Sequence, residues 1–307
     1  MTVRHFLADD DLTPAEQEQV LNLAAEMKAE PFKYRPFEGP QSVAILTDKP
    51  TLRTQVSFHA GIAELGGNPM LVDGNLAQVG VRETIADVTR VLSRHVAAIA
   101  WRTGAQARIE EMAAYASVPV VNALTDDYHP CQILACLQTI TEHKGHRAGL
   151  TFSYFGDGAN NMANSYALGL VTAGLHVRIS APAGFHPEQA ILDRARRIGE
   201  ATGGTVEVIE DPQAAADGAD VICTDTWVSM GQDGAEERER VFRPYSVTSD
   251  LMSHAKDDAI VMHCLPAYRG KEIAEDVLEK HAQVLFDEAE NRRHAQKAIL
   301  TFLAQGA

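Results

Sequence analysis

Short apolar runs alternate with helical patterns through the first half of the chain. The runs are rich in Val, Ile, Leu and Ala, which is typical of strands buried on both faces of a parallel sheet. We expect strands at 42–46, 70–72, 97–101 and 118–122, and helices at 51–65, 83–93, 107–116 and 129–143. Strands and helices that alternate in this way predict a parallel α/β domain.

The alternation restarts after the polar segment 144–149, which we interpret as a domain boundary. We expect strands at 150–155, 176–180, 206–209, 219–224, 260–263 and 283–286, and helices at 164–173, 187–202 and 290–303. The glycine-containing, charged segment 227–245 shows no clear periodicity, so we expect a long loop that is either a lid or a disordered excursion. The fold class predicted is α/β, with two parallel-sheet domains.

Composition excludes several classes of function. The net charge of −15 makes nucleic acids and anionic membranes unfavourable partners. The N-terminus lacks the apolar core of a signal peptide, and no run approaches the roughly 18 apolar residues of a membrane-spanning helix. The four cysteines form no C-x-x-C pair, so neither a zinc site nor a disulfide framework is indicated. We expect a cytoplasmic protein without a metal or another cofactor.

Three polar groups in the first half follow expected strands or open expected helices. The segment Thr51–Thr54 carries an arginine and two threonines at a helix start, where unpaired N–H groups and the helix dipole favour an anion. Arg102 ends a strand, where open α/β sheets bind their ligands. His129 and Gln132 are three residues apart on a first helical turn and can face one ligand. Singly, each group is also compatible with a helix cap or a surface ion pair.

Further polar groups occur in the second half. The glycine-rich turn Gly156–Asn161 lacks the third glycine of G-x-G-x-x-G, and no acidic residue follows the next strand, so a dinucleotide is the weaker interpretation. Asn161 would instead offer an amide to an amino acid. Asp225–Gly231 places a carboxylate and a hydroxyl four residues apart, which suits an α-amino group. His263–Pro266 follows the next strand, and Glu290–Arg292 opens the last helix. Taken alone, a polar turn is the better interpretation of Asp225–Gly231, and an exposed helix arginine is the better interpretation of Arg292.

Taken together, these motifs resemble those of the ornithine carbamoyltransferases, within the aspartate/ornithine carbamoyltransferase family. The matching pieces are Thr51-Leu52-Arg53-Thr54 (family S-T-R-T), Arg102, His129-Pro130-Cys131-Gln132 (H-P-x-Q), Asn160-Asn161-Met162, Asp225–Gly231 (D-x-x-x-S-M-G), His263-Cys264-Leu265-Pro266-Ala267 and Glu290-Asn291-Arg292. The S-M-G and H-C-L-P elements are the specific ones, because aspartate carbamoyltransferases share S-T-R-T and H-P-x-Q but lack the S-M-G loop.

The resemblance implies two doubly wound α/β domains linked by two interdomain helices. Residues 1–146, completed by the helix 288–307, would bind carbamoyl phosphate, and residues 147–287 would bind L-ornithine. It implies carbamoyl transfer to the ornithine side-chain amine, giving citrulline in arginine biosynthesis, by a homotrimer or an assembly of trimers. The implied catalytic residues are Arg102, His129, Asp225 and Cys264. The implied carbamoyl phosphate contacts are Thr51, Leu52, Arg53, Thr54, Gln78 (reaching a neighbouring subunit's site), Arg102, His129, Gln132, Cys264, Leu265 and Arg292. The implied ornithine contacts are Asn161, Asp225, Ser229 and Met230.

Three positions depart from the family pattern in the helix expected at 51–65. Leu52 replaces a threonine, so one hydroxyl donor is lost. Gln55 and His59 replace an arginine and a glutamate that would face each other one turn apart, and we interpret this joint change as a replaced structural pair. Two alternatives stay open. One is a carbamoyltransferase for another amine, such as putrescine or N-acetylornithine, and the other is a ligand-binding paralogue without turnover, which only Leu52 supports.

Overall fold

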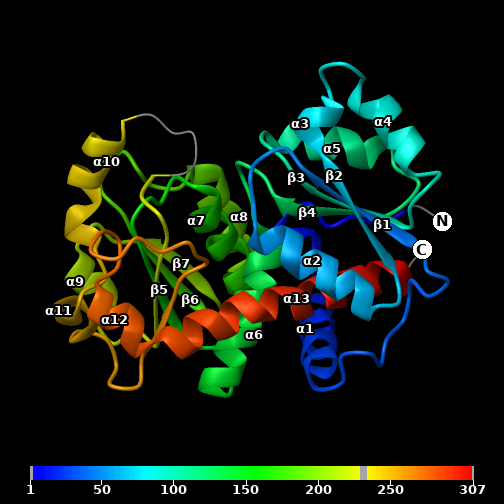
Figure 1. Ribbon diagram of the computed structural model, residues 1–307. Helices are drawn as coiled ribbons and strands as arrows, with labels where there is room; N and C mark the ends of the chain where they lie inside the picture. The colour runs from blue at the N-terminus through cyan, green and yellow to red at the C-terminus, as the bar shows by residue number, and fades with distance from the viewer. Residues whose placement is uncertain (1–2, 229–233, 306–307) are drawn as a thin grey trace. The chain divides into compact units, whose positions relative to one another are not determined.

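The computed structural model describes residues 3–228 and 234–305 and consists of two compact units (Figure 1). Unit 1 comprises Met1–Ala135 and Glu290–Ala307, and unit 2 comprises Cys136–Ala289. The chain passes from one unit to the other within two helices, α6 (Pro130–Lys144) and α13 (Ala282–Gln305). Each unit has its own parallel sheet and its own hydrophobic core.

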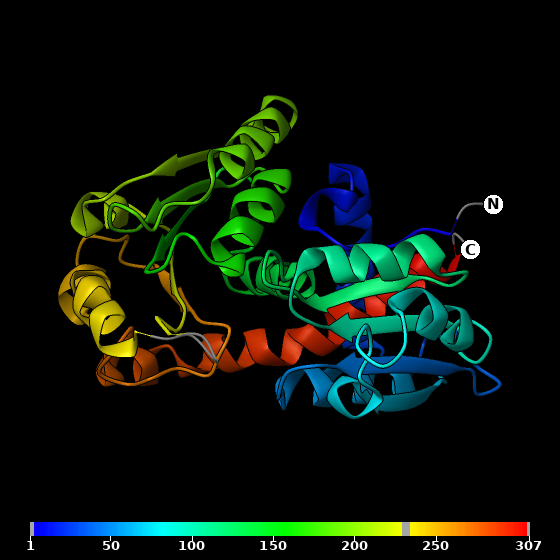
Figure 2. The same ribbon diagram turned by 90° about the horizontal axis from the view of Figure 1, so that it is seen from above.

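Unit 1 is built on a parallel sheet with the strand order β2-β1-β3-β4. The strands are β1 (Ser42–Thr47), β2 (Asn68–Asp73), β3 (Ala98–Arg102) and β4 (Val120–Leu124). The helices are α1 (Pro14–Ala29), α2 (Arg53–Glu64), α3 (Gly74–Ala77), α4 (Ile85–Leu92) and α5 (Gln106–Tyr115), with the start of α6 and most of α13. Because right-handed crossovers lead from β1 toward both edges, α2 covers one face of the sheet and α4 and α5 cover the other (Figures 1 and 2).

The two central strands carry the core of unit 1. Val43–Leu46 of β1 and Ala98–Trp101 of β3 are buried without interruption, as expected for parallel strands covered on both faces. Trp101 packs in one cluster with Ile109 and Met112 of α5. This packing holds the carboxyl ends of β1 and β3 side by side.

Unit 2 is built on a parallel sheet with the strand order β7-β6-β5-β8-β9. The strands are β5 (Thr151–Phe155), β6 (His176–Ser180), β7 (Thr205–Val208), β8 (Val221–Thr224) and β9 (Ile260–Met262). The helices are α7 (Asn161–Ser165), which continues as a π-helical turn (Tyr166–Leu170), α8 (Gln189–Thr202), α9 (Pro212–Ala216), α10 (Ala235–Phe242), α11 (Ser249–Met252) and α12 (Glu275–Lys280). Phe155, Ile222 and Val261 of three neighbouring strands share one buried cluster with Leu278 and Leu285.

The structure corrects the sequence prediction in three places. The strand expected at 283–286 belongs to α13, which begins at Ala282; Val284 and Leu285 are buried and Phe286 is exposed, so the apolar run marks one face of a helix. The segment 227–245 is not all loop, because α10 spans Ala235–Phe242. Helix α1 was not expected. Among the residues described, no helix is both long and apolar enough to cross a membrane.

Candidate active site

Each sheet reverses its winding direction between two neighbouring strands, and open α/β sheets bind ligands at such a point. In unit 1 the reversal lies between β1 and β3, which pair Thr47 with Arg102 at their carboxyl ends. In unit 2 it lies between β5 and β8, which pair Phe155 with Thr224. The chain continues from these four strand ends into predicted site residues, namely Thr51–Thr54, Arg102, Asn161 and Asp225.

The Thr54 hydroxyl is the centre of a cationic cluster in unit 1. Arg292 Nη2 donates to Thr54 Oγ1 at 2.9 Å, and Arg102 Nη1 donates to the same oxygen at 3.3 Å. Thr54 and Arg292 are buried, whereas Arg102 is half-buried. A hydroxyl has two acceptor positions and one proton. The two guanidinium groups fill both acceptor positions, so the Thr54 O–H is left to donate.

His129 and Gln132 are both buried at the start of α6. Pro130 is the first residue of this helix, where the missing N–H costs no hydrogen bond. Burial, together with the charges of Arg292 and Arg102, holds the pKa of His129 well below its ordinary value. His129 is therefore a neutral imidazole at pH 7, and its ring N–H is an uncharged donor close to two guanidinium groups.

Helix α2 begins without a side-chain cap. Its N-cap residue is Leu52, and this residue makes no capping hydrogen bond, whereas Thr13 and Thr84 cap α1 and α4. The Leu52 side chain is 71% exposed and leaves the helix end uncovered. The first N–H groups of α2 are thus offered to an anion, beside the half-buried Arg53.

A polar network centred on Asp48 was missed from the sequence. Asp48 follows β1 and accepts hydrogen bonds from Trp101 Nε1 at 3.0 Å and Thr103 Oγ1 at 2.6 Å. Arg108 of α5 donates to the same carboxylate at 3.3 Å and to the Val79 carbonyl at 2.8 Å. The network fixes the chain just before the predicted carbamoyl phosphate contacts. Its partners lie 53 to 60 residues from Asp48, so no local pattern indicated them.

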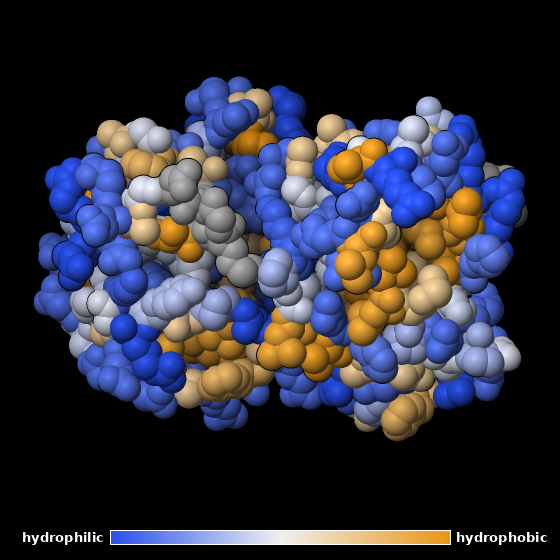
Figure 3. Space-filling model, turned by 45° about the horizontal axis from the view of Figure 1, so that its top comes forward, coloured by the Kyte–Doolittle hydropathy of each residue, from blue (hydrophilic) through white to orange (hydrophobic). Residues whose placement is uncertain are grey.

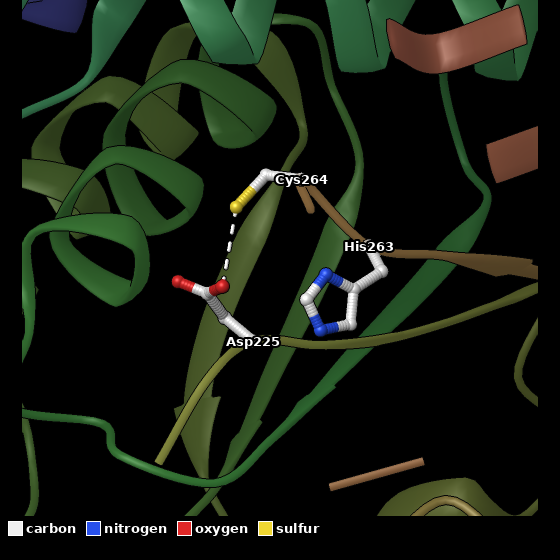
Figure 4. Close-up of side chains that lie close together, drawn as sticks. All are labelled: Asp225, His263 and Cys264. Atoms are coloured by element: carbon white, nitrogen blue, oxygen red, sulfur yellow. Dashed lines mark hydrogen bonds between the residues drawn. The ribbon is translucent and has the colours of Figure 1, made fainter. Parts of the chain in front are cut away.

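In unit 2, Asp225 and Cys264 form a hydrogen-bonded pair (Figure 4). Asp225 follows β8, Cys264 follows β9, and the Cys264 thiol donates to Asp225 Oδ1 at 3.2 Å. Burial and the Asp225 charge raise the pKa of the Cys264 thiol well above its ordinary value, so the sulfur stays protonated. Burial also raises the pKa of Asp225. Cys264 is therefore a neutral donor and not a thiolate nucleophile.

His263 holds the backbone beside this pair. Its Nδ1 accepts from the Leu265 N–H at 2.9 Å, which leaves Nε2 to donate to Glu272 at 3.2 Å. Both His263 and Glu272 are buried. Leu265 has a φ of 55°, a left-handed conformation that costs about 1–2 kcal/mol for a residue other than glycine. The bond to His263 stabilises that conformation. Glu272 was missed from the sequence because nothing near it indicates a buried partner.

The ligand atoms of Asp225, His263 and Cys264 lie within 4.8 Å of one another, close enough to hold a metal ion. Both ring nitrogens of His263 take part in hydrogen bonds within unit 2. Coordination by this ring would break one of them, so the geometry favours a positioning role for His263 over metal binding.

The remaining predicted contacts are less closely defined. Asn161 is the first residue of α7, a helix capped by Asn160 Oδ1, which accepts from the Ala163 N–H at 2.9 Å. Gln78 is exposed at the end of α3, with a φ of 49°. Ser229 and Met230 lie outside the residues that the structure describes.

These parallel sheets, with polar side chains at their carboxyl ends, place the chain among the open α/β proteins, a class that binds its ligands at that edge of the sheet. Two family models match the chain: the carbamoyl-phosphate-binding domain of aspartate/ornithine carbamoyltransferase over residues 4–142, and the aspartate/ornithine-binding domain over residues 148–303. The chain therefore belongs to the aspartate/ornithine carbamoyltransferase family.

Relatives of known name match along the whole chain. An ornithine carbamoyltransferase from Mycolicibacterium paratuberculosis is 56% identical over 306 residues, 99% of each chain. One from Clavibacter sepedonicus is 56% identical over 302 residues, 98% of each chain. Among solved structures, the ornithine carbamoyltransferase from Pyrococcus furiosus has a TM-score of 0.94 at 41% identity, covering 100% of this chain and 98% of that one. The anabolic enzyme from Campylobacter jejuni has a TM-score of 0.94 at 34% identity, covering 99% and 100%.

Proposed function

We propose that the protein transfers the carbamoyl group of carbamoyl phosphate to the side-chain amine of L-ornithine, releasing L-citrulline and phosphate. The observation that carries the proposal is the Thr54 cluster, in which two guanidinium groups share one hydroxyl acceptor beside a neutral histidine. Such a set of donors suits an anionic acyl phosphate. The full-length relatives named ornithine carbamoyltransferase support ornithine as the acceptor. We place the reaction in cytoplasmic arginine biosynthesis.

Unit 1 would bind carbamoyl phosphate. The phosphate would accept from the uncapped N–H groups of α2 and from Thr51, Arg53 and Arg102. Arg292 would add charge beside Thr54. We also assign Gln132 and the Leu265 carbonyl to the carbamoyl NH2 group, and the C-terminal helix to the carbamoyl-phosphate-binding domain.

The carbonyl oxygen would face the Thr54 hydroxyl, the Arg102 guanidinium and the His129 ring. With its acceptor positions filled, Thr54 can only donate, and the low pKa of His129 keeps its ring a neutral donor. As the amine nitrogen attacks the carbonyl carbon, negative charge gathers on this oxygen. Donors already in place stabilise that charge without having to reorganise.

The attacking amine must be neutral. A lysine-like pKa of ~10.4 leaves about one molecule in ~2,500 uncharged at pH 7, which costs roughly 4.6 kcal/mol. Asp225 and the Cys264 thiol would orient the amine in this form, and Asn161, Ser229 and Met230 would join Asp225 in holding the α-amino and carboxylate groups. When the tetrahedral intermediate collapses, the bond from carbon to the phosphate oxygen breaks. The departing phosphate takes the amine proton, so no protein base is needed.

We further propose that the protein assembles as a homotrimer, or as an assembly of trimers. Four apolar residues are 58–83% exposed at the N-cap and in the first turn of α2, on α3 and in the segment after α3, namely Leu52, Val56, Leu76 and Val81. Both helices pack against β2. Hydrophobic residues gather on the surface of unit 1 seen in Figure 3, and patches of this kind often mark interfaces. Gln78 lies between Leu76 and Val81 in sequence, which supports its contact with a neighbouring subunit's site. Leu76→Asp should reduce the mass measured by light scattering, and an unchanged mass would contradict this interface.

The proposed function is tested by citrulline and phosphate release from purified protein. Carbamoyl phosphate is supplied with ornithine, putrescine, aspartate or N-acetylornithine. We expect product from ornithine alone. Carbamoyl phosphate binding without product from any amine would instead support a paralogue without turnover.

Arg53→Ala tests the phosphate contacts, and Arg90→Ala is its matched control. Arg90 is an exposed arginine of α4 that pairs with Asp87 at 2.9 Å. Only the first change should lower turnover, and neither should unfold the protein. Wild-type activity in Arg53→Ala would refute the phosphate assignment.

A further inference from the structure

Arg238 of α10 joins two separate segments of unit 2. Its Nη2 donates to Asp157 Oδ2 in a short, charge-assisted contact, and its Nε donates to the Trp227 carbonyl at 2.8 Å. Asp157 lies in the turn after β5, and Trp227 lies three residues after the end of β8. A single guanidinium group thus links α10 to the ends of both strands at which the sheet reverses.

The surroundings of Arg238 give this link more strength than an ordinary surface pair. The side chains of Arg238 and Asp157 are 17% and 7% exposed. The guanidinium carbon lies 5.3 Å from the ring centre of Phe185 and 5.2 Å from that of Phe242, distances typical of cation–π contacts. Breaking such a pair leaves a buried charge without its partner, which costs far more than the loss of an exposed pair.

Asp157 controls the turn that leads to Asn161. Its Oδ1 accepts from the Ala159 N–H at 3.0 Å while its Oδ2 meets Arg238, and its own carbonyl accepts from the Tyr154 hydroxyl at 3.3 Å. The next residues begin α7 at Asn161. Any shift of Asp157 is therefore passed to the helix start that carries this amide.

Trp227 depends on Arg238 in a similar way. The indole is 3% exposed, but within the part of the chain that the structure describes its Nε1–H finds no acceptor. What holds the residue is packing, including the Phe242 ring at 6.4 Å, and the bond from Arg238 to its carbonyl. Asp225 is two residues before Trp227, so the same bond restrains the carboxylate proposed to hold the amine.

We propose that Arg238 is a positioning residue for the amino-acid substrate. Its guanidinium group bonds both Asp157 and Trp227, and so keeps Asn161 and Asp225 at a fixed separation. Arg238 would therefore set the affinity for ornithine and leave the affinity for carbamoyl phosphate unchanged. This inference rests on the proposed function and adds a residue to it. A purely structural role would lower the amount of active enzyme but leave both KM values unchanged.

The test compares Arg238→Gln with Arg240→Gln. Arg240 lies on the same helix, but it pairs with the exposed Glu237 at 2.6 Å. We expect Arg238→Gln to raise the KM for ornithine about tenfold or more, because each loss of about 1.4 kcal/mol in binding is a factor of ten. The KM for carbamoyl phosphate should stay unchanged, and Arg240→Gln should match wild type. Unchanged KM values in Arg238→Gln would overturn the proposal.

Two further variants keep the proposal testable if Arg238→Gln folds poorly. Arg238→Lys keeps a charge for Asp157 but cannot make both bonds, so it should raise the ornithine KM by an intermediate factor. Asp157→Asn keeps an acceptor for the Ala159 N–H, and combining it with Arg238→Gln should do no more harm than the worse single change, because the two act through one contact. Additive losses would mean that they act separately, contrary to the proposal.

A spectroscopic readout comes from the two tryptophans of the chain, Trp101 and Trp227. With 5-fluorotryptophan incorporated, the ¹⁹F spectrum should contain one signal from each, assigned through Trp101→Phe. Arg238→Gln should shift or broaden the Trp227 signal and leave the Trp101 signal unchanged. An unchanged Trp227 signal would contradict the proposal that Arg238 restrains Trp227. If wild-type protein makes no citrulline, the proposed function fails. If wild-type protein makes citrulline but Arg238→Gln leaves the KM for ornithine unchanged, only this inference fails.

Discussion

Thr54→Val tests the cationic cluster of unit 1 most directly. Valine has nearly the shape of threonine but no hydroxyl. In this variant Arg292 and Arg102 lose the oxygen to which both donate, at 2.9 Å and 3.3 Å. The oxyanion that forms during carbamoyl transfer loses one of its three proposed donors. Stability and catalysis are therefore both affected, for separate physical reasons.

The two effects differ in size. A hydrogen bond to a charged group contributes about 1.5–3 kcal/mol. The shorter bond, from buried Arg292, falls within this range, and the longer bond, from half-buried Arg102, contributes less because water can replace it. We expect the free energy of unfolding to fall by about 2–4 kcal/mol. We expect kcat to fall by ~10²–10³, the usual effect of removing one oxyanion donor.

Citrulline formation at saturating levels of both substrates gives kcat, and urea unfolding followed by circular dichroism gives the free energy. Thr54→Ser is the matched control, because it keeps the hydroxyl and removes only the methyl group. It should remain close to wild type in kcat. A wild-type kcat in Thr54→Val would refute the donor role. Equal losses in both variants would show that packing of the methyl group, and not the hydroxyl, matters at this position.

Three further predictions concern other buried groups. Cys264→Ala removes the thiol that donates to Asp225 at 3.2 Å, so kcat/KM for ornithine should fall about tenfold or more. Carbamoyl phosphate binding, measured by calorimetry, should stay largely intact. An unchanged kcat/KM for ornithine would reject the role of the thiol. Burial raises the pKa of Asp225, so its carboxyl group holds a proton more tightly in the folded protein than in the unfolded chain. The free energy of unfolding therefore falls as pH rises from 3.8 through the raised pKa, because the carboxyl group loses that proton. Asp225→Asn should therefore have a higher free energy of unfolding than wild type in urea at pH 7, and it should be inactive. A lower free energy of unfolding would contradict the expectation that the Asp225 carboxylate destabilises the fold. Glu64→Gln leaves the buried Lys297, at 2.6 Å, without its carboxylate and should cost about 3–5 kcal/mol, whereas Glu290→Gln, in an exposed pair with Arg293, should cost under about 1 kcal/mol.

The strands were predictable from sequence wherever they are buried on both faces. β1 and β3 are continuous apolar runs for this reason. β6 has the predicted bounds, 176–180, although His176 and Arg178 are only half-buried. The strand prediction at 283–286 was wrong because four apolar residues do not distinguish a strand from one turn of a helix. Helix α1 was overlooked although it carries a local signal, the capping box formed by Thr13 and Glu16.

Only part of the candidate site could be predicted from the sequence. Motif segments at strand ends could be located because parallel strands bring their carboxyl ends to one edge of a sheet. The residues that hold those segments in place could not be located from the sequence. Asp48 meets partners on β3 and α5, His263 meets Glu272, and Arg238 meets Asp157 across 81 residues. Each of these contacts depends on how several elements pack, and no short spacing in the sequence reports it.

The departures from the family pattern in α2 now have a physical interpretation. Gln55 Nε2 donates to Thr47 Oγ1 at 3.4 Å, so a neutral side chain joins the first turn of α2 to the end of β1. Leu52 is exposed at a helix end that no side chain caps. The anion donors offered there are backbone N–H groups, which every residue but proline supplies. Loss of the threonine hydroxyl therefore removes one donor but leaves the charge and geometry of the helix end intact, so Leu52 is compatible with an active enzyme.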